Sequence, residues 1–235
     1  MSYPDIHPPI GKPRSMRRLL LSKSLLLLVS ILLLAQPWAV RAQGEPPQDE
    51  VSKLLAALAG DDLLAQEKAA QRLAELAPTG AVPQLAQIFL TSATPRPAAT
   101  VLAAIGAPAA MNVLMTALED EALTARRNAA QIALAQAGDK AVPFLLEGLQ
   151  ASAAPLRHNS ALMLGYIGSP RAVGPLLRIA RNDEDPNIRR EAVWALSEIG
   201  GVRVQLALMG IARTDPDKTV RDEAEHALFR GRGEF

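Results

Sequence analysis

The sequence predicts an all-α protein built from stacked helical hairpins, that is, an α-solenoid. Two observations carry the prediction: a short phrase recurs about every 30 residues, and apolar residues with helical spacing lie between its recurrences. Composition agrees, because 49% of the 235 residues are apolar but only 3% are aromatic. So few aromatic side chains argue against a large ligand pocket.

The recurring phrase combines alanine, valine, proline and leucine. It begins at residues 81, 141 and 172, and in looser form at residues 110 and 204. Proline costs no hydrogen bond in the first turn of a helix, because the amide there has no partner within the helix. Each phrase therefore predicts the start of the second helix of a hairpin.

The first helix of each hairpin is predicted from an apolar stripe, best seen just before Gly200. The stripe follows spacings of three and four residues: Ile188, Ala192, Ala195, Leu196 and Ile199. Gly200 then stands where a left-handed C-terminal cap belongs, and acidic residues at 183–185 precede the helix, which suits capping. One such hairpin cannot bury its own stripe, so neighbouring hairpins must stack.

With these phrases, the chain resembles the HEAT-repeat proteins, specifically the short variety called phycobilisome-lyase HEAT-like repeats. The resemblance covers about residues 50–230. It implies a right-handed α-solenoid of about five HEAT-like helical hairpins with a partial one at each end, whose second helices line the concave face. Residues 94–97 (Thr-Pro-Arg-Pro) depart from the pattern and predict a short first helix in that repeat.

Residues 1–42 have a different character from the rest. They hold six of the 25 Lys+Arg and one of the 24 Asp+Glu, about +5, which leaves about −4 for the remainder. From Met16 onward, basic residues, an apolar stretch and Val40-Arg41-Ala42 have the layout of a signal peptide cleaved after Ala42. Residues 1–15 do not resemble a signal, which favours Met16 as the true start.

These features divide the chain into a signal peptide (1–42), a linker (43–49) and the repeat domain (50–235). We expect export to the periplasm, the thylakoid lumen or the exterior of a bacterial cell. The alternative is an uncleaved membrane anchor formed by residues 19–40.

Several classes of function are disfavoured by composition. The chain has no cysteine, which excludes a disulfide framework, a thiolate zinc site and a cysteine nucleophile. A mildly acidic domain is a poor nucleic-acid binder. No glycine-rich phosphate-binding loop occurs.

Candidate metal and catalytic residues are few. The repeat domain has two histidines, His158 and His226, about two repeats apart, and neither is followed by glutamate as in iron-dependent hydroxylases of this repeat class. His158, Asn159 and Ser160 are adjacent but lack a nucleophile elbow and an orienting carboxylate. We therefore predict no metal, no cofactor and no catalytic residue.

Partner-binding residues are predicted on the second helices. Aligning the recurring phrases gives five candidates at solvent-facing or recurring positions: Gln87, Thr116, Phe144, Glu147 and Arg178. Aromatic anchors dominate binding energy, which favours Phe144, although a role in core packing stays open for it.

Charge is distributed unevenly over the repeats. Between Leu76 and Leu118 only Arg96 is charged, which predicts a contact face for a partner or a second copy of the chain; alanine-rich composition alone is the other interpretation. The arginine pairs Arg126-Arg127 and Arg189-Arg190 recur at matching positions of their helices, with Arg157 and Arg221 nearby in theirs. We expect an Asp–Arg ladder that joins neighbouring repeats, with a basic ridge for an acidic partner as the alternative.

The sequence thus favours an exported scaffold that mediates protein–protein interaction or complex assembly through its concave face, without catalysis of its own. The alternative, from the resemblance, is a bilin lyase or isomerase acting on phycobiliproteins. Those enzymes work in the cytosol as two-subunit assemblies, so the leader counts against this alternative.

Overall fold

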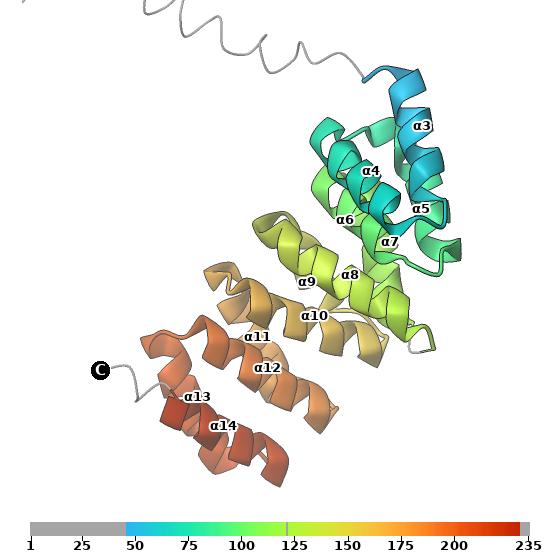
Figure 1. Ribbon diagram of the computed structural model, residues 1–235. Helices are drawn as coiled ribbons and strands as arrows, with labels where there is room; N and C mark the ends of the chain where they lie inside the picture. The colour runs from blue at the N-terminus through green and yellow to red at the C-terminus, as the bar shows by residue number, and fades with distance from the viewer. Residues whose placement is uncertain (1–45, 121, 231–235) are drawn as a thin grey trace, which may run out of the picture. The chain divides into compact units, whose positions relative to one another are not determined.

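The computed structural model describes residues 46–120 and 122–230, which fall within one compact unit. All regular structure in these residues is helical, with twelve α-helices and three short 3₁₀ turns (Figure 1). The predicted signal peptide, residues 1–42, lies outside the described residues. The first helix begins at Gln48, so the repeat domain starts two residues before the predicted residue 50. None of the described helices is long and apolar enough to cross a bilayer.

The helices alternate between two rows along the stack. The first row comprises α4 (Leu63–Leu76), α6 (Arg96–Ile105), α8 (Thr124–Ala137), α10 (Ala154–Ile167), α12 (Pro186–Ile199) and α14 (Lys218–Arg230). The second row comprises α3 (Gln48–Leu58), α5 (Val82–Thr91), α7 (Pro108–Glu119), α9 (Val142–Gly148), α11 (Val173–Asn182) and α13 (Val202–Thr214). Successive members form five hairpins, α4–α5 to α12–α13, with α3 and α14 as partial units. The predicted α-solenoid of about five hairpins is confirmed.

The recurring phrase starts second-row helices, as predicted. Helices α5 and α9 begin at Val82 and Val142, and each has proline in its first turn. The departure at residues 94–97 also has the expected effect: α6 has 10 residues, whereas α4, α8, α10 and α12 have 14 each.

Most first-row helices end at a residue with positive φ. Gly106, Gly168 and Gly200 take φ angles of 65°, 69° and 73°. Gly200 caps α12 as predicted, but its ψ of −165° places it outside the expected left-handed helical region. At the equivalent end of α4 the residue is Ala77, whose φ is 43°. An alanine in this left-handed region carries a steric cost that glycine avoids.

The core runs the length of the stack between the two rows. Recurring leucines from both rows are at most 2% exposed: Leu73, Leu102, Leu134, Leu164 and Leu196 from the first row, and Leu85, Leu114, Leu145, Leu176 and Leu208 from the second. Each hairpin thus buries one leucine per helix against its neighbours, as the stacking argument requires.

In the C-terminal repeats, consecutive first-row helices are in closer contact than consecutive second-row helices. Helix α12 contacts both α10 and α14 along much of its length, whereas α11 and α13 touch at few points. Between α8 and α10 the contact is as limited as in the second row. Small residues permit this approach: a Cβ atom on Gly165 would lie 2.7 Å from Cζ3 of Trp194 and 2.9 Å from Cα of Ala195. Because a stack bends toward its more closely spaced row, this spacing puts the first row on the concave side of these repeats. This differs from the expectation that the second helices line it.

Candidate protein-binding site

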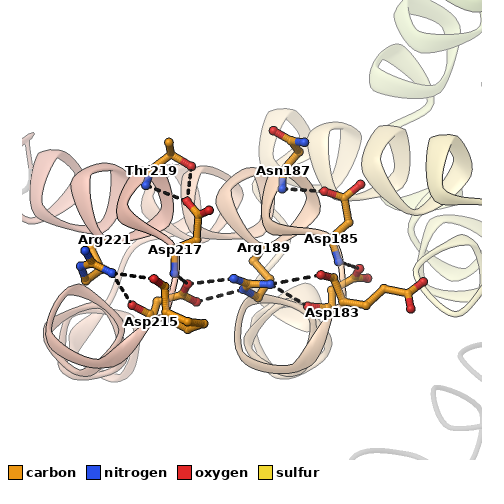
Figure 2. A network of polar contacts seen from close by, with 10 residues as sticks. Asp183, Asp185, Asn187, Arg189, Asp215, Asp217, Thr219 and Arg221 are labelled. Carbon is orange, nitrogen blue, oxygen red and sulfur yellow. Dashed lines mark hydrogen bonds and ion pairs between the residues drawn. The ribbon is translucent and has the colours of Figure 1, made fainter.

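Two buried ion pairs join neighbouring repeats in the C-terminal half. The guanidinium of Arg157 donates to both carboxylate oxygens of Asp183, at 2.8 and 3.1 Å. Arg189 donates in the same way to Asp215, at 3.0 and 2.9 Å (Figure 2). All four side chains are at most 11% exposed. These hydrogen bonds to carboxylates raise the pKa of Arg157 and of Arg189.

Arg157 and Arg189, and the corresponding Arg221 of the last helix, also bind the loop that precedes their own helix. Nη1 of Arg189 donates to the Asp183 carbonyl at 3.0 Å, and Nη1 of Arg221 donates to the Asp215 carbonyl at 2.7 Å. Arg157 likewise reaches the Ser152 carbonyl at 2.8 Å. Each of Arg157 and Arg189 therefore ties two successive loops together. The predicted Asp–Arg ladder is confirmed, and neither arginine belongs to a basic ridge.

A neutral version of the ladder occupies the N-terminal half. Gln66 stands at the position of Arg157 in its repeat and is 3% exposed. Its amide donates to the Gly60 carbonyl, and the Thr94 hydroxyl donates to its Oε1 at 2.9 Å. The next repeat has Pro95 there, which offers no polar side chain. The sequence did not predict a role for Gln66, because the recurring residue at this position is arginine. The signal that identifies Gln66 is its alignment with Arg157 relative to the loops.

The five predicted partner-binding residues lie on the second row. The four polar ones are exposed at corresponding positions of successive helices: Gln87 on α5, Thr116 on α7, Glu147 on α9 and Arg178 on α11. Phe144 on α9 is half-buried and packs against the core. The structure brings these residues onto the convex side of the stack. Their role in binding stays a prediction.

The first row presents a second, more apolar face, which we call the inner face. It consists of three recurring positions, all exposed or half-buried: Asn128, His158, Arg190 and Asp222; then Ile132, Leu162, Trp194 and His226; then Gln136, Tyr166, Glu198 and Arg230. The middle position is apolar in three successive helices, α8, α10 and α12. An apolar stripe therefore crosses three repeats on the concave side.

An aromatic pair marks the centre of the inner face. The rings of Tyr166 and Trp194 meet edge to face between α10 and α12, with centroids 5.1 Å apart and an interplanar angle of 67°. Tyr166 is 64% exposed, and Ile132 nearby in the stripe is 42% exposed. Sequence reasoning missed this pair because it sought the binding face on the other row.

Ionisable groups surround the aromatic pair. Nε2 of His158 lies 3.9 Å from Oε2 of Glu191, too far for a hydrogen bond. Burial lowers the pKa of His158 and raises the pKa of Glu191. Arg230 lies 2.8 Å from Glu223 and 3.6 Å from Glu198. The inner face therefore combines apolar surface with partly buried charge.

The residues considered for chemistry are not assembled into a catalytic centre. Ser160 is fully buried, and its hydroxyl has no hydrogen-bond partner among the described residues. Asn159 donates instead to the carbonyl of Leu118 at 2.8 Å. His158 lies on α10 and His226 on α14, with α12 between them. Within residues 46–120 and 122–230, no three His, Asp or Glu side chains converge on a point that could hold a metal ion.

The inner face is hollowed in its N-terminal part. A shallow groove there is lined by residues of three successive first-row helices, among them Glu67, Gln71, Arg96, Thr100 and Gln136. Arg96, the lone charge between Leu76 and Leu118, thus faces this groove.

Residues 142–228 match the family model for HEAT repeats. This part of the chain consists of HEAT repeats. The expected resemblance is confirmed there, and these HEAT repeats contain both the Asp–Arg ion pairs and the Tyr166–Trp194 pair. No curated protein sequence matches the chain.

Three solved structures illustrate the likeness of fold. Human deoxyhypusine hydroxylase is 24% identical, with a TM-score of 0.44 over 84% of this chain and 88% of its own. A designed armadillo repeat protein in complex with the peptide (KR)4 is 18% identical, with a TM-score of 0.41 over 77% and 98%. The CpcE–CpcF complex of phycocyanin lyase from Nostoc is 20% identical, with a TM-score of 0.36 over 97% and 93%. These likenesses concern the fold and assign no activity to this chain.

Proposed function

We propose that this chain is an exported scaffold that binds another protein through its inner face. The observation that carries the proposal is the apolar stripe of Ile132, Leu162 and Trp194, extended by the exposed ring of Tyr166. Interface cores are enriched in aromatic side chains, and aromatic residues supply most of the anchors that dominate binding energy.

The dimensions of the stripe favour a protein over a small ligand. Neighbouring packed helices lie about 8–10 Å apart, so a stripe over α8, α10 and α12 extends for roughly 20 Å. An extended peptide segment rises about 3.3 Å per residue and would cover the stripe with about six residues. A drug-sized molecule needs an enclosed pocket instead.

The scaffold supports such a face with rigid elements. All side chains of the stripe lie on helices, and the loops beside α10 and α12 are held by Arg157 and Arg189. A preorganised surface loses little entropy on binding, which favours affinity. Export is supported by the signal-like layout of residues 1–42.

The test is a crosslinked affinity purification of the tagged full-length chain from its native host, after fractionation into cytosol, membranes and exported material. Mass spectrometry would identify the partner and the N-terminus of the bait. We expect a bait that begins at Gln43 in the exported fraction, with one stoichiometric protein partner.

Two double variants locate the binding face. Ile132→Ser with Tyr166→Ala alters two exposed inner-face residues and should abolish capture without changing helicity. Phe144→Ala with Arg178→Glu alters two of the residues predicted from sequence on the second row. Capture stays intact in this variant if the inner face binds the partner, and is lost if the sequence-based prediction holds. Loss only in the second-row variant would overturn the inner-face assignment. If the bait is recovered uncleaved from the cytosol together with a chromophore-bearing protein, the lyase alternative is supported. If the chain self-associates through residues 76–118, a second copy of the bait is captured instead.

A further inference from the structure

We propose that Tyr166, Trp194 and Glu191 form a subsite for an arginine side chain of the bound protein. The inference rests on the proposed function, because it names the chemistry by which the inner face would recognise its partner. Three features of the site carry it: the open aromatic pair, an under-satisfied carboxylate beside it, and the local balance of charge.

The aromatic pair offers a surface on which a cation can stack. Because Tyr166 and Trp194 meet edge to face and Tyr166 is 64% exposed, ring surface remains open to solvent. The face of an aromatic ring attracts a cation through its quadrupole, and tryptophan does so most strongly. Arginine is the cation most often found in this position.

Glu191 supplies a carboxylate that lacks hydrogen bonds. It precedes Trp194 by three residues, so both side chains lie on the same side of α12. The side chain retains 15% exposure, and the imidazole of His158 lies 3.9 Å from its carboxylate. Arg190, its neighbour in α12, interacts with it electrostatically without forming an ion pair among the described residues. No hydrogen-bond donor from the described residues reaches it. Among the described residues, the buried side-chain polar atom without a partner is Oγ of Ser160, so the oxygens of Glu191 are open to solvent and accessible to a donor from a bound protein.

The charges around the pair favour a cation. Burial lowers the pKa of His158, so the imidazole is neutral near pH 7 and does not cancel the charge of Glu191. Arg230 is engaged by two further carboxylates, Glu223 and Glu198. Arg190 opposes an incoming cation, and it has no ion pair within the described residues. Three carboxylates against two arginines leave a net charge of about −1.

Arginine fits this arrangement better than lysine. A planar guanidinium can stack on Trp194 and at the same time donate two parallel hydrogen bonds to one carboxylate. The ammonium group of lysine is a compact charge without a face to stack.

The experiment uses the full chain with Trp38→Phe, which makes Trp194 the only tryptophan and therefore a fluorescent reporter of the subsite. The probe is the capped pentapeptide acetyl-Gly-Ser-Arg-Ser-Gly-amide, titrated into the millimolar range. We expect a saturable change in Trp194 fluorescence. The same peptide with citrulline, a neutral isostere of arginine, should bind about tenfold more weakly or worse.

Two single variants in the same background complete the design. Glu191→Gln should weaken binding of the arginine peptide about tenfold. The matched control is Glu119→Gln, which removes an exposed carboxylate from α7 in the second row and should change nothing. Circular dichroism of each variant checks that the fold is intact.

Equal affinity for the citrulline peptide, no effect of Glu191→Gln, or no fluorescence response from a folded protein would overturn the arginine subsite. Tighter binding of the corresponding aspartate peptide would do the same and would assign the site to an acidic side chain read by Arg190. The proposed function is tested separately. If the variant with Tyr166→Ala and Ile132→Ser no longer captures the native partner but Glu191→Gln still does, the proposed function holds and the arginine subsite is refuted.

Discussion

The space beside Gly165 is filled by the neighbouring helix, which makes this residue a sensitive test of the packing between α10 and α12. Gly165→Ala would place a Cβ atom 2.7 Å from Trp194 and 2.9 Å from the Ala195 backbone. We expect a loss of about 1–3 kcal/mol in the free energy of unfolding, because a backbone cannot yield as a side chain can.

The matched control for Gly165 is Gly210 in α13, where no atom lies within 4 Å of the added Cβ. Gly210→Ala should raise the free energy of unfolding by about 0.5–1 kcal/mol, since alanine is the better helix former. Urea unfolding followed by circular dichroism measures both. Similar destabilisation by the two substitutions would contradict close packing at Gly165.

His158 makes stability depend on pH. Burial lowers its pKa in the folded protein below the value of about 6.5 expected in the unfolded chain. The unfolded chain therefore binds a proton more readily, and stability is lost as the pH falls through about 6.5 toward the folded pKa. His158→Gln should flatten this part of the profile, measured by urea unfolding at several pH values from neutral to mildly acidic.

The control for His158→Gln is His226→Gln, which makes the same substitution at an exposed residue on α14. The neighbouring Glu191 acts in the opposite direction: burial raises its pKa, so its contribution favours the folded state as the pH falls further into the range where carboxylates protonate. A profile for His158→Gln that matches the wild type would refute the effect assigned to this histidine.

Among the elements, α4 ends less favourably than its counterparts. Ala77 takes a φ of 43° where α6 and α10 end with glycine at 65° and 69°. Ala77→Gly should raise the free energy of unfolding by about 1 kcal/mol, because it removes the left-handed penalty of a residue with a Cβ. Thermal unfolding of the two proteins would show the gain.

A suitable comparison for Ala77→Gly is Ala59→Gly, at the end of α3, where φ is −84° and alanine is unstrained. The added freedom of glycine in the unfolded chain should then lower stability. A gain at Ala59, or none at Ala77, would argue against strain at the end of α4.

The elements themselves could be predicted well from sequence, because their signals are local. Pro83 and Pro143 in the recurring phrases mark helix starts, and Gly106, Gly168 and Gly200 mark helix ends. The prolines near residue 95 likewise explain the short α6. Each of these signals acts within one turn of backbone and needs no tertiary context.

The candidate site could not be predicted in the same way. Which row faces inward depends on how closely helices approach, and that depends on pairs such as Gly165 and Trp194, which are 29 residues apart in sequence. The buried role of Gln66 likewise depends on Thr94 in the next repeat. The Asp–Arg ladder was predictable because its members recur with the period of the repeat.

For the whole molecule, the ladder divides the stack into a charged C-terminal half and a neutral N-terminal half. Arg189→Met would leave Asp215 buried without its partner, which should lower the free energy of unfolding by about 3 kcal/mol. Stability in repeat proteins is transmitted mainly between neighbours. Native-state hydrogen exchange should therefore show loss of protection concentrated in α12 to α14, with α4 and α6 retaining theirs.

Lys218→Met provides the contrast to Arg189→Met. It removes an exposed ion pair between Lys218 and Asp222 on α14, and such pairs contribute little. Its exchange pattern should match that of the wild type. Uniform loss of protection along the whole stack in Arg189→Met would show that the repeats unfold as a single unit.

The missing polar connection at Pro95 bears on the mechanics of the stack. A solenoid behaves as an elastic rod, and its resistance to bending at each repeat depends on the contacts that hold successive loops together. Helix α6 is the shortest helix of its row, and Pro95 offers no polar side chain at the position where Gln66 and Arg157 hold their loops. The rod is therefore most compliant at α6, and a long partner would be gripped by two stiff segments that can change their mutual angle at this joint.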